Sequence, residues 1–204
     1  MDAPGTAARL ADRFGPDVLR VVQSCGDTVV SVGAARAHEM LAWLRDDPEQ
    51  QFNYLTDITA VDYRDPEMPL EVVYQLRSLD RKVDLRLKVP LDKQGTLRVD
   101  SVVDLWAGAN WLEREVYDMF GVTFAGHPDL RRILMWETYT EGFPLRKDFP
   151  LRGHFSRAEQ TRQALAGNPE AHYSLEELSI AEAFGDLPED MRARLERGER
   201  GEMR

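Results

Sequence analysis

VDLRLKV, residues 83–89, alternates apolar and charged side chains without a break. Val83, Leu85, Leu87 and Val89 fall on one side of an extended chain, and the charged residues between them fall on the other. This alternation predicts a strand with one buried side and one side in water. Strands of this kind are typical of antiparallel sheets that are covered on a single face.

The sequence before this strand supplies the other parts of such a sheet. Four more strands are predicted at 18–22, 28–32, 52–63 and 70–76, and helices at 6–14 and 37–44, ended by Gly15 and Pro48. A parallel doubly wound fold would need longer buried strands. We therefore expect an α+β fold, a two-layer domain with helices on one side of a mixed, largely antiparallel sheet.

Another amphipathic helix is predicted further along the chain. Apolar residues recur at spacings of four and three residues between Leu112 and Phe120, which places them on one helical face. Gly121 is expected to end this helix because glycine is common just past helix C-termini. A short strand over residues 122–124 should follow.

Charged residues share this helix. Arg114 and Asp118 are four residues apart and are expected to pair, while Glu115 and Asp118 lie three apart on one side. With Glu113, these carboxylates include candidates for a general acid and base, but no nearby nucleophile or metal-binding triad completes such a site. We interpret the group as a charged helix face.

The segment from Trp136 to Pro150 has little periodicity. Residues that precede proline avoid the helical conformation, so the backbone is expected to be extended here. Extended segments that alternate apolar and charged residues typically lie along the surface of another protein. The candidate partner-binding residues of this segment are Pro144, Leu145, Arg146, Lys147, Asp148, Phe149 and Pro150.

Several isolated residues have both a functional and a structural interpretation. His127 is expected to bond the backbone of its loop, because a metal ion would need further His or Cys ligands at short spacing. Arg131 and Arg132 would either bind the carboxylates of a partner or a phosphate, or remain solvated. Trp106 and Trp111 are expected in the core, which leaves Trp136 as the better interface candidate.

The composition excludes several classes of protein. The chain has 204 residues and a net charge of -10, which argues against binding to nucleic acid or directly to anionic lipid. No apolar run approaches the ~20 residues that cross a bilayer, and the N-terminal residues lack a signal-peptide pattern. We expect a protein that is made and kept in the cytosol.

Cofactor-binding patterns are also missing from the sequence. Cys25 is the only cysteine, which excludes an internal disulfide and an iron-sulfur cluster held by four thiolates of this chain. The sequence contains no G-x-G, no phosphate-binding GxxxxGK, no GxSxG and no HExxH. We expect no catalytic residue, no bound cofactor and no metal in this chain.

Two blocks of the sequence resemble one known family. The first block comprises Glu113, Arg114, Glu115, Asp118, Met119 and Phe120, followed by His127, Arg131, Ile133 and Leu134. The second block is PLRKDFP at 144–150, and weaker similarity extends the resemblance over about residues 50–152. Together they resemble the C subunit of NADH-quinone oxidoreductase (NDH-1), which is part of the peripheral arm of respiratory complex I.

This resemblance implies a scaffold that carries no cofactor. In the family, the C subunit binds the D subunit, which forms the quinone pocket with the B subunit, and FMN, iron-sulfur clusters and quinone belong to partner subunits. It implies that the segment 136–152 lies across the D subunit, with Arg146 and Lys147 meeting carboxylates. It also implies contacts with other peripheral-arm subunits and a peripheral, indirect association with the cytoplasmic side of the cell membrane.

We expect three parts, a globular α+β domain at 1–135, an extended partner-binding segment at 136–152 and an acidic helical tail at 153–204. Capping-box pairs at Ser156–Glu159 and Ser174–Glu177 predict the starts of tail helices. Two other functions stay open. One is the equivalent subunit of a related membrane-bound hydrogenase or ferredoxin-type dehydrogenase, and the other is a free-standing acid/base enzyme that uses Glu115, Asp118 and His127.

Overall fold

The computed structural model describes residues 2–136, 138–151, 153–156 and 159–163. Contacts divide the chain into two compact units, Met1–Ser156 and Arg157–Arg204. Of the second unit, the described residues 159–163 are helical, and they follow the capping-box serine at 156. The other helices that the sequence predicts for the tail lie outside the described residues.

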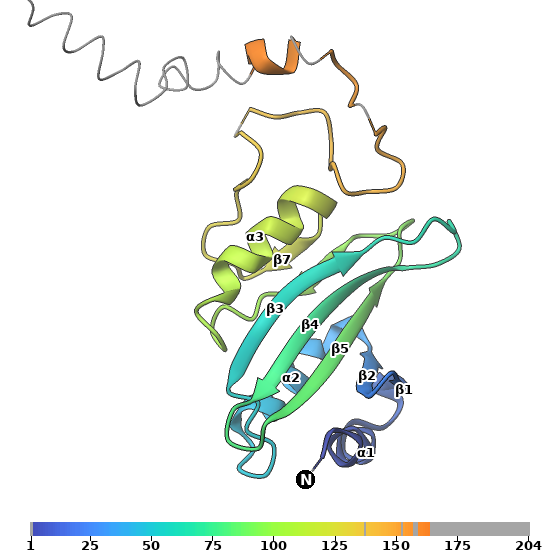
Figure 1. The fold of residues 1–204 in the computed structure, drawn as a ribbon, viewed down its shortest axis with the longest axis vertical. Helices are drawn as coiled ribbons and strands as arrows, with labels where there is room; N and C mark the ends of the chain where they lie inside the picture. Colours follow the sequence, from blue (N-terminus) through green and yellow to red (C-terminus); the bar gives the residue numbers. More distant parts are fainter. Residues whose placement is uncertain (1, 137, 152, 157–158, 164–204) are drawn as a thin grey trace, which may run out of the picture. The chain divides into compact units, whose positions relative to one another are not determined.

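The first unit contains nearly every element that the hydrophobic patterns predict (Figure 1). The strand pair formed by β6 and the two short 3-10 helices were not predicted, because segments of three residues carry no readable period. The elements are α1 (Ala3–Phe14), η1 (Gly15–Asp17), β1 (Val18–Ser24), β2 (Asp27–Val32), η2 (Ala34–Arg36), α2 (Ala37–Asp46), β3 (Tyr54–Val61), β4 (Leu70–Ser78), β5 (Val83–Leu91), β6 (Arg98–Asp100), α3 (Ala109–Phe120) and β7 (Thr123–Ala125).

Five strands form one sheet in the order β1-β2-β5-β4-β3. Strands β2 and β5 pair in parallel, and the other neighbours are antiparallel, as the sequence predicted for a mixed, largely antiparallel sheet. In the central pair, Leu85 lies opposite Leu76 and Leu87 lies opposite Tyr74, and all four are buried. A separate two-stranded sheet pairs β6 with β7 in parallel.

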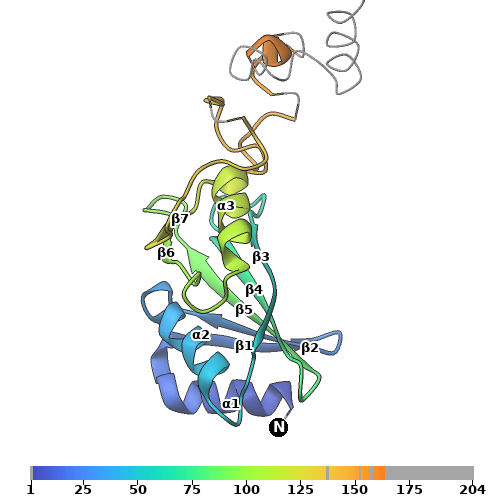
Figure 2. The same ribbon diagram turned by 90° about the vertical axis from the view of Figure 1, so that its left-hand side faces the viewer.

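The three helices and one face of the main sheet share a single hydrophobic core, and Figure 2 shows α3 running alongside β3. Each helix buries the apolar stripe that its spacing predicted. The opposite face of the sheet carries charged residues that pair across strands, including Lys88 with Glu71 at 2.7 Å and Arg77 with Asp84 at 3.1 Å. This arrangement confirms the two-layer α+β domain.

The backbone of residues 143–149 is not extended, contrary to the expectation from its prolines. The amide of Arg146 donates to the carbonyl of Phe143, and the amide of Phe149 donates to the carbonyl of Arg146, each at 3.2 Å. The amide of Leu145 also donates to the carbonyl of Met119 in the last turn of α3, at 3.1 Å. Consecutive turns therefore fold this segment against α3, inside the first compact unit.

The tryptophans separate into buried and exposed positions. Trp106 is buried as expected, but Trp111 is 61% exposed, so its assignment to the core was wrong. It lies on the outer side of α3, where the guanidinium of Arg114 covers its ring at 5.4 Å from the ring centroid. Trp136 is half-buried and packs edge-on against Tyr139, with ring centroids 4.9 Å apart.

Candidate partner-binding surface

Helix α3 carries two carboxyl groups that are fully buried, Glu113 and Asp118. The sequence had suggested a charged, solvated face for these residues, and only Glu115 is exposed as that interpretation requires. Residues 113, 116 and 120 share one face of a helix, so the carboxyl group of Glu113 points where the core packs. The structure has to satisfy both carboxyl groups internally.

Glu113 is bonded to the turn that precedes α3. Its carboxylate accepts hydrogen bonds from the hydroxyl of Ser101 and the amide of Val102, each at 2.7 Å. Burial raises the pKa of Glu113 to about 7, and these two hydrogen bonds oppose the rise. The group therefore fixes the 101–102 turn and titrates near neutral pH.

Asp118 is bonded to the chain beyond β7. One carboxylate oxygen accepts the amides of Ile133, Leu134 and Met135 at 2.8 to 3.0 Å. The other oxygen pairs with Arg132 at 2.6 Å. Burial alone would raise the pKa of Asp118, but the hydrogen bond from Met135 and the bonds from its other partners lower it below its usual value. Asp118 is thus the anchor of residues 132–135.

The pair that was expected between Arg114 and Asp118 is replaced by other contacts. Asp118 pairs with Arg132, whereas Arg114 donates to the backbone carbonyls of Arg131 at 3.2 Å and Arg132 at 3.0 Å. Residues four apart on a helix can meet, yet a partner from a distant segment offers a buried, charge-assisted alternative. Both side chains therefore hold the 131–150 loop, defined here as the residues between Arg131 and Pro150.

A second set of contacts fixes the far end of the 131–150 loop. The guanidinium groups of Arg132 and Arg146 lie over the ring of Phe143, at 5.4 and 4.6 Å from its centroid. Arg146 also donates to the carbonyl of Phe120, the last residue of α3, at 2.5 Å. Arg146 therefore caps the C-terminal end of α3, a role that its position in the sequence did not indicate.

Gly121 makes this close approach possible. Its φ of 73° is left-handed, and a Cβ atom there would lie 2.6 Å from Nη2 of Arg146 and against the ring of Phe143. The glycine that ends α3 thus also provides the space into which the loop packs.

His127 makes two hydrogen bonds to backbone, which is the structural interpretation. Its Nδ1 accepts the amide of Asp129 at 3.0 Å, so Nε2 carries the proton and donates to the carbonyl of Asn110 at 3.1 Å. Within the described parts of the chain, no group of three or more His, Cys, Asp or Glu side chains is placed to hold a metal ion. No helix of the described residues is long and apolar enough to cross a bilayer.

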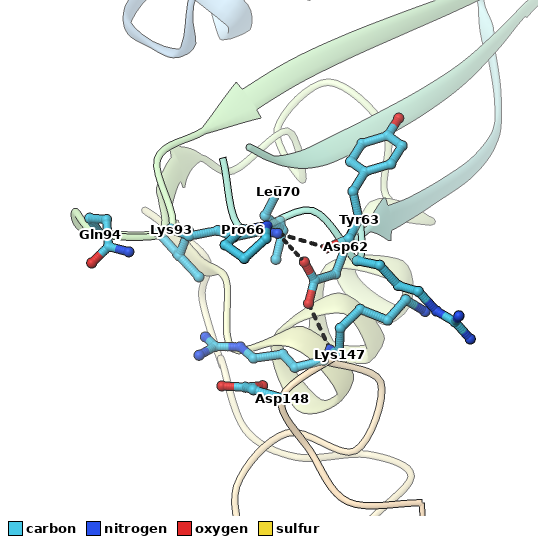
Figure 3. Close-up of a pocket in the computed structure, with 11 residues that line it drawn as sticks. Asp62, Tyr63, Pro66, Leu70, Lys93, Gln94, Lys147 and Asp148 are labelled. Atoms are coloured by element: carbon cyan, nitrogen blue, oxygen red, sulfur yellow. Dashed lines mark hydrogen bonds and ion pairs between the residues drawn. The ribbon is translucent and has the colours of Figure 1, made fainter. Parts of the chain in front are cut away.

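Asp62 and Lys93 complete the site, and sequence reasoning did not select them. The carboxylate of Asp62 accepts the amide of Lys147 at 2.8 Å and pairs with the ammonium of Lys93 at 2.7 Å (Figure 3). Burial would raise the pKa of Asp62, but the amide of Lys147 and the charge of Lys93 lower it below its usual value. Neither residue belongs to a recognisable motif, so only the fold reveals the contact.

These contacts surround a cleft of about 450 Å³. The β3–β4 connection, the β5–β6 connection and the 131–150 loop form its walls (Figure 3). Its lining comprises Asp62, Tyr63, Arg64, Pro66, Leu70, Lys93, Gln94, Leu97, Arg146, Lys147 and Asp148.

Several residues of the loop and of the stretch after it remain accessible. Leu134 is 60% exposed and Leu145 is 51% exposed, and Leu151 and Phe155 also lie outside the core. Lys147 and Asp148 are exposed as well, while Pro144, Phe149 and Pro150 are half-buried. A loop that is tied down by buried charges and still exposes leucines is typical of a protein-binding surface.

The fold belongs to a class that occurs in respiratory membrane complexes. A trypsin-resistant fragment of Nqo5 aligns with a TM-score of 0.53 and 32% identity, over 61% of this chain and 99% of the fragment. A chain of the membrane-bound sulfane sulfur reductase, an archaeal respiratory membrane complex, aligns with a TM-score of 0.59 and 22% identity, over 78% of this chain and 89% of its own length. The latter likeness concerns the fold alone.

The sequence comparisons identify the family. Residues 30–155 match the model of the 30 kDa subunit of the respiratory-chain NADH dehydrogenase, and the chain belongs to this family. The NADH-quinone oxidoreductase C subunit numbered 2 of Rhizobium etli is 47% identical over 148 residues, which cover 72% of this chain and 77% of that protein. The corresponding C subunit of Citrifermentans bemidjiense is 43% identical, over 71% of this chain and 88% of its own length.

A third relative joins two subunits in one chain. The C/D subunit of NADH-quinone oxidoreductase from Acidiphilium cryptum is 41% identical over 186 residues, which cover 82% of this chain but only 31% of that longer protein.

Proposed function

We propose that this chain is a peripheral-arm subunit of proton-translocating NADH-quinone oxidoreductase that holds the D and B subunits around the quinone site. The observation that carries this proposal is the 131–150 loop, which contains most of the family signature and is fixed to α3 by Asp118, Arg114 and Arg146. Electrons would pass from NADH through FMN and iron-sulfur clusters to quinone in the partner subunits. This chain would supply a binding surface and no catalytic group.

A loop that is fixed before binding is suited to this role. Association costs conformational entropy when a partner has to order flexible segments. The buried pair of Asp118 and Arg132, with a separation of 2.6 Å, already holds the loop in the isolated chain. Leu134 and Leu145 are therefore presented to a partner at little further entropic cost.

The D subunit is the partner that the comparisons favour. In the Acidiphilium cryptum relative, the part that resembles this chain belongs to a single polypeptide named as a C/D fusion. Physical linkage of two subunits keeps their surfaces at high effective concentration and suits partners that are in contact. The contacts with the B subunit and with other peripheral-arm subunits belong to the same proposal.

The structure changes the role assigned to one basic residue. Arg146 is engaged within the chain, where it caps α3 and covers Phe143, so we assign it to loop positioning. The side chain of Lys147 is exposed and remains a candidate for contact with carboxylates of the D subunit.

A related complex with another electron donor is the second candidate. The shared fold with a chain of the sulfane sulfur reductase complex is the observation in its favour. The relatives with 41–47% identity are all named as subunits of NADH-quinone oxidoreductase, and this favours the first proposal.

The test is affinity purification of the tagged full chain from its native membranes, with mass spectrometry and an assay of NADH-quinone activity. We expect the D and B subunits to co-purify with the activity, and washing at high salt without detergent to release the peripheral arm. Recovery of hydrogenase-type subunits would assign the chain to a sister complex. Recovery of the chain alone would reject the scaffold.

A further inference from the structure

We propose that the cleft beside Asp62 binds a carboxylate-bearing segment of a partner chain, with an apolar side chain next to the carboxylate. This inference rests on the proposed function, because the partner is a neighbouring subunit of the complex. It names the chemistry by which that neighbour would be recognised. It also adds Arg64, which neither the motifs nor the ion pairs of the loop had indicated.

The cleft is built from three segments that are far apart in the sequence. Asp62–Pro66 follows β3, Lys93–Leu97 follows β5, and Arg146–Asp148 belongs to the 131–150 loop (Figure 3). A volume of about 450 Å³ accommodates a few side chains of a peptide. Because the hydrogen bond between Asp62 and the amide of Lys147 closes one wall, the cleft exists only while the loop is docked.

The acidic residue inside the cleft is already neutralised. Both oxygens of Asp62 are used, one by the ammonium of Lys93 at 2.7 Å and one by the amide of Lys147 at 2.8 Å. Lys93 also donates to the carbonyls of Tyr63 at 2.9 Å and Asp65 at 3.3 Å. This buried pair therefore contributes shape to the cleft and almost no net charge.

The cations that remain give the cleft a positive character. Arg64, Arg146 and Lys147 line it, against the single exposed carboxylate of Asp148. Within the described part of the chain, the guanidinium of Arg64 and the ammonium of Lys147 have no ion-pair partner. The whole chain has a net charge of -10, so a local excess of cations is unusual on this surface. An anionic group is the complementary ligand.

The other wall of the cleft is apolar and selects the type of anion. Pro66, Leu70 and Leu97 line it, and an apolar side chain would be desolvated there. A phosphate site usually relies on a cradle of backbone amides or a helix N-terminus. The cations here extend from connecting segments and lie beside apolar surface. This combination suits a peptide that carries Asp or Glu next to an apolar residue.

The first experiment measures how tightly the full chain binds membranes from a strain that lacks it. We expect the double variant Arg64→Gln, Lys147→Gln to weaken binding about fivefold at physiological salt, because two exposed charge pairs are lost. The matched control is Arg20→Gln, Lys82→Gln, which removes one exposed arginine and one exposed lysine away from the cleft. Equal affinity of the two double variants would overturn the inference.

The second experiment identifies the occupant. A photo-crosslinking residue, p-benzoylphenylalanine, replaces Gln94, an exposed residue at the cleft. The complex is purified through the tagged chain, and the crosslinked fragment is sequenced. We expect a segment of another subunit that contains Asp or Glu beside an apolar residue.

The two experiments separate failure of the inference from failure of the proposed function. An intact complex with no crosslink, or with a crosslink to a neutral or basic segment, would overturn the inference alone. Capture of a phospholipid would assign the cleft to a headgroup and overturn it too. Purification without any other part of the oxidoreductase would reject the proposed function, and the inference with it.

Discussion

At position 113 a buried carboxyl group receives two hydrogen bonds, whereas the carboxyl group at position 118 receives bonds from three amides and one arginine. Each additional donor favours the ionised form, while burial disfavours it. The pKa of Glu113 therefore rises to about 7, and the pKa of Asp118 falls below its usual value. Residues five positions apart on one helix thus differ in charge over a wide range of pH.

The raised pKa of Glu113 predicts a specific dependence of stability on pH. The folded protein holds this proton up to about pH 7, whereas the unfolded chain releases it near 4.5. The contribution of Glu113 to stability is thus fully present below about pH 4.5 and is lost as pH rises through about 7. Glu113→Gln should gain about 3 kcal/mol relative to the natural chain across this range. Denaturant unfolding at several pH values measures the difference.

Glu115→Gln is the control for this comparison, because Glu115 lies on the same helix and is exposed. Its stability relative to the natural chain should change little with pH. A constant difference between Glu113→Gln and the natural chain at all pH values would contradict the assignment.

At the level of elements, the important contact is between the end of α3 and the 131–150 loop. The helix ends at Gly121, and the loop returns to this point through Leu145, Arg146 and Phe143. A helix terminus leaves carbonyl groups without partners, and the loop supplies two of the missing donors. The loop and the helix therefore stabilise one another.

Gly121→Ala should separate the two. The left-handed φ of 73° is strained for alanine, and the added Cβ would collide with Phe143 and Arg146. We expect the free energy of unfolding to fall by about 3 kcal/mol. Limited trypsin digestion, followed by mass spectrometry, should also show faster cleavage after Lys147.

Gly126→Ala distinguishes the collision from the backbone strain. Gly126 also has a left-handed φ, of 83°, but nothing lies within 4 Å of its added Cβ. It should cost about 1 to 2 kcal/mol, without faster cleavage in the loop. If both variants behaved alike, the packing of the loop against Gly121 would not matter.

The elements of the sheet could be predicted because each has a period that shows in its own residues. Strand β5 alternates strictly, and its buried residues are those that the pattern selected. The turns of residues 143–149 could not be predicted, because their hydrogen bonds include one to Met119 in a different element. Local restrictions before proline allow both extended and turn conformations. The outcome depended on what lay nearby.

On the scale of the whole molecule, exposed apolar residues occur on the loop that buried charges hold. Leu134 and Leu145 are 60% and 51% exposed, although the chain has a large core in which leucines are otherwise buried. Anchor residues of this kind often supply most of the affinity of an interface.

The double variant Leu134→Ser, Leu145→Ser should weaken recovery of the D subunit by about tenfold in the affinity purification. Its free energy of unfolding should stay close to that of the natural chain, since both side chains are already largely in water. The control is Leu19→Ser, Leu79→Ser, which changes two leucines that are 56% and 53% exposed on β1 and on the β4–β5 connection. An equal loss of the D subunit in the control would show that the loop is not the interface.

The sequence by itself determined the helices, the strands, the α+β class and the family resemblance. These follow from periodicity and from blocks of adjacent residues, which are local properties of a chain. The candidate site residues were recognised from the same blocks, but their partners were not. Trp111 and the Arg114–Asp118 pair were assigned wrongly for this reason.

Only the tertiary structure decided which charges are buried and what each of them holds. Asp118 meets Arg132, and Asp62 meets Lys93 and Lys147, across separations of 14 to 85 residues. The energy of such a contact depends on burial and on donors from distant elements, and neither quantity can be read from neighbouring residues. The cationic cleft and the fixed loop therefore exist only in the folded chain.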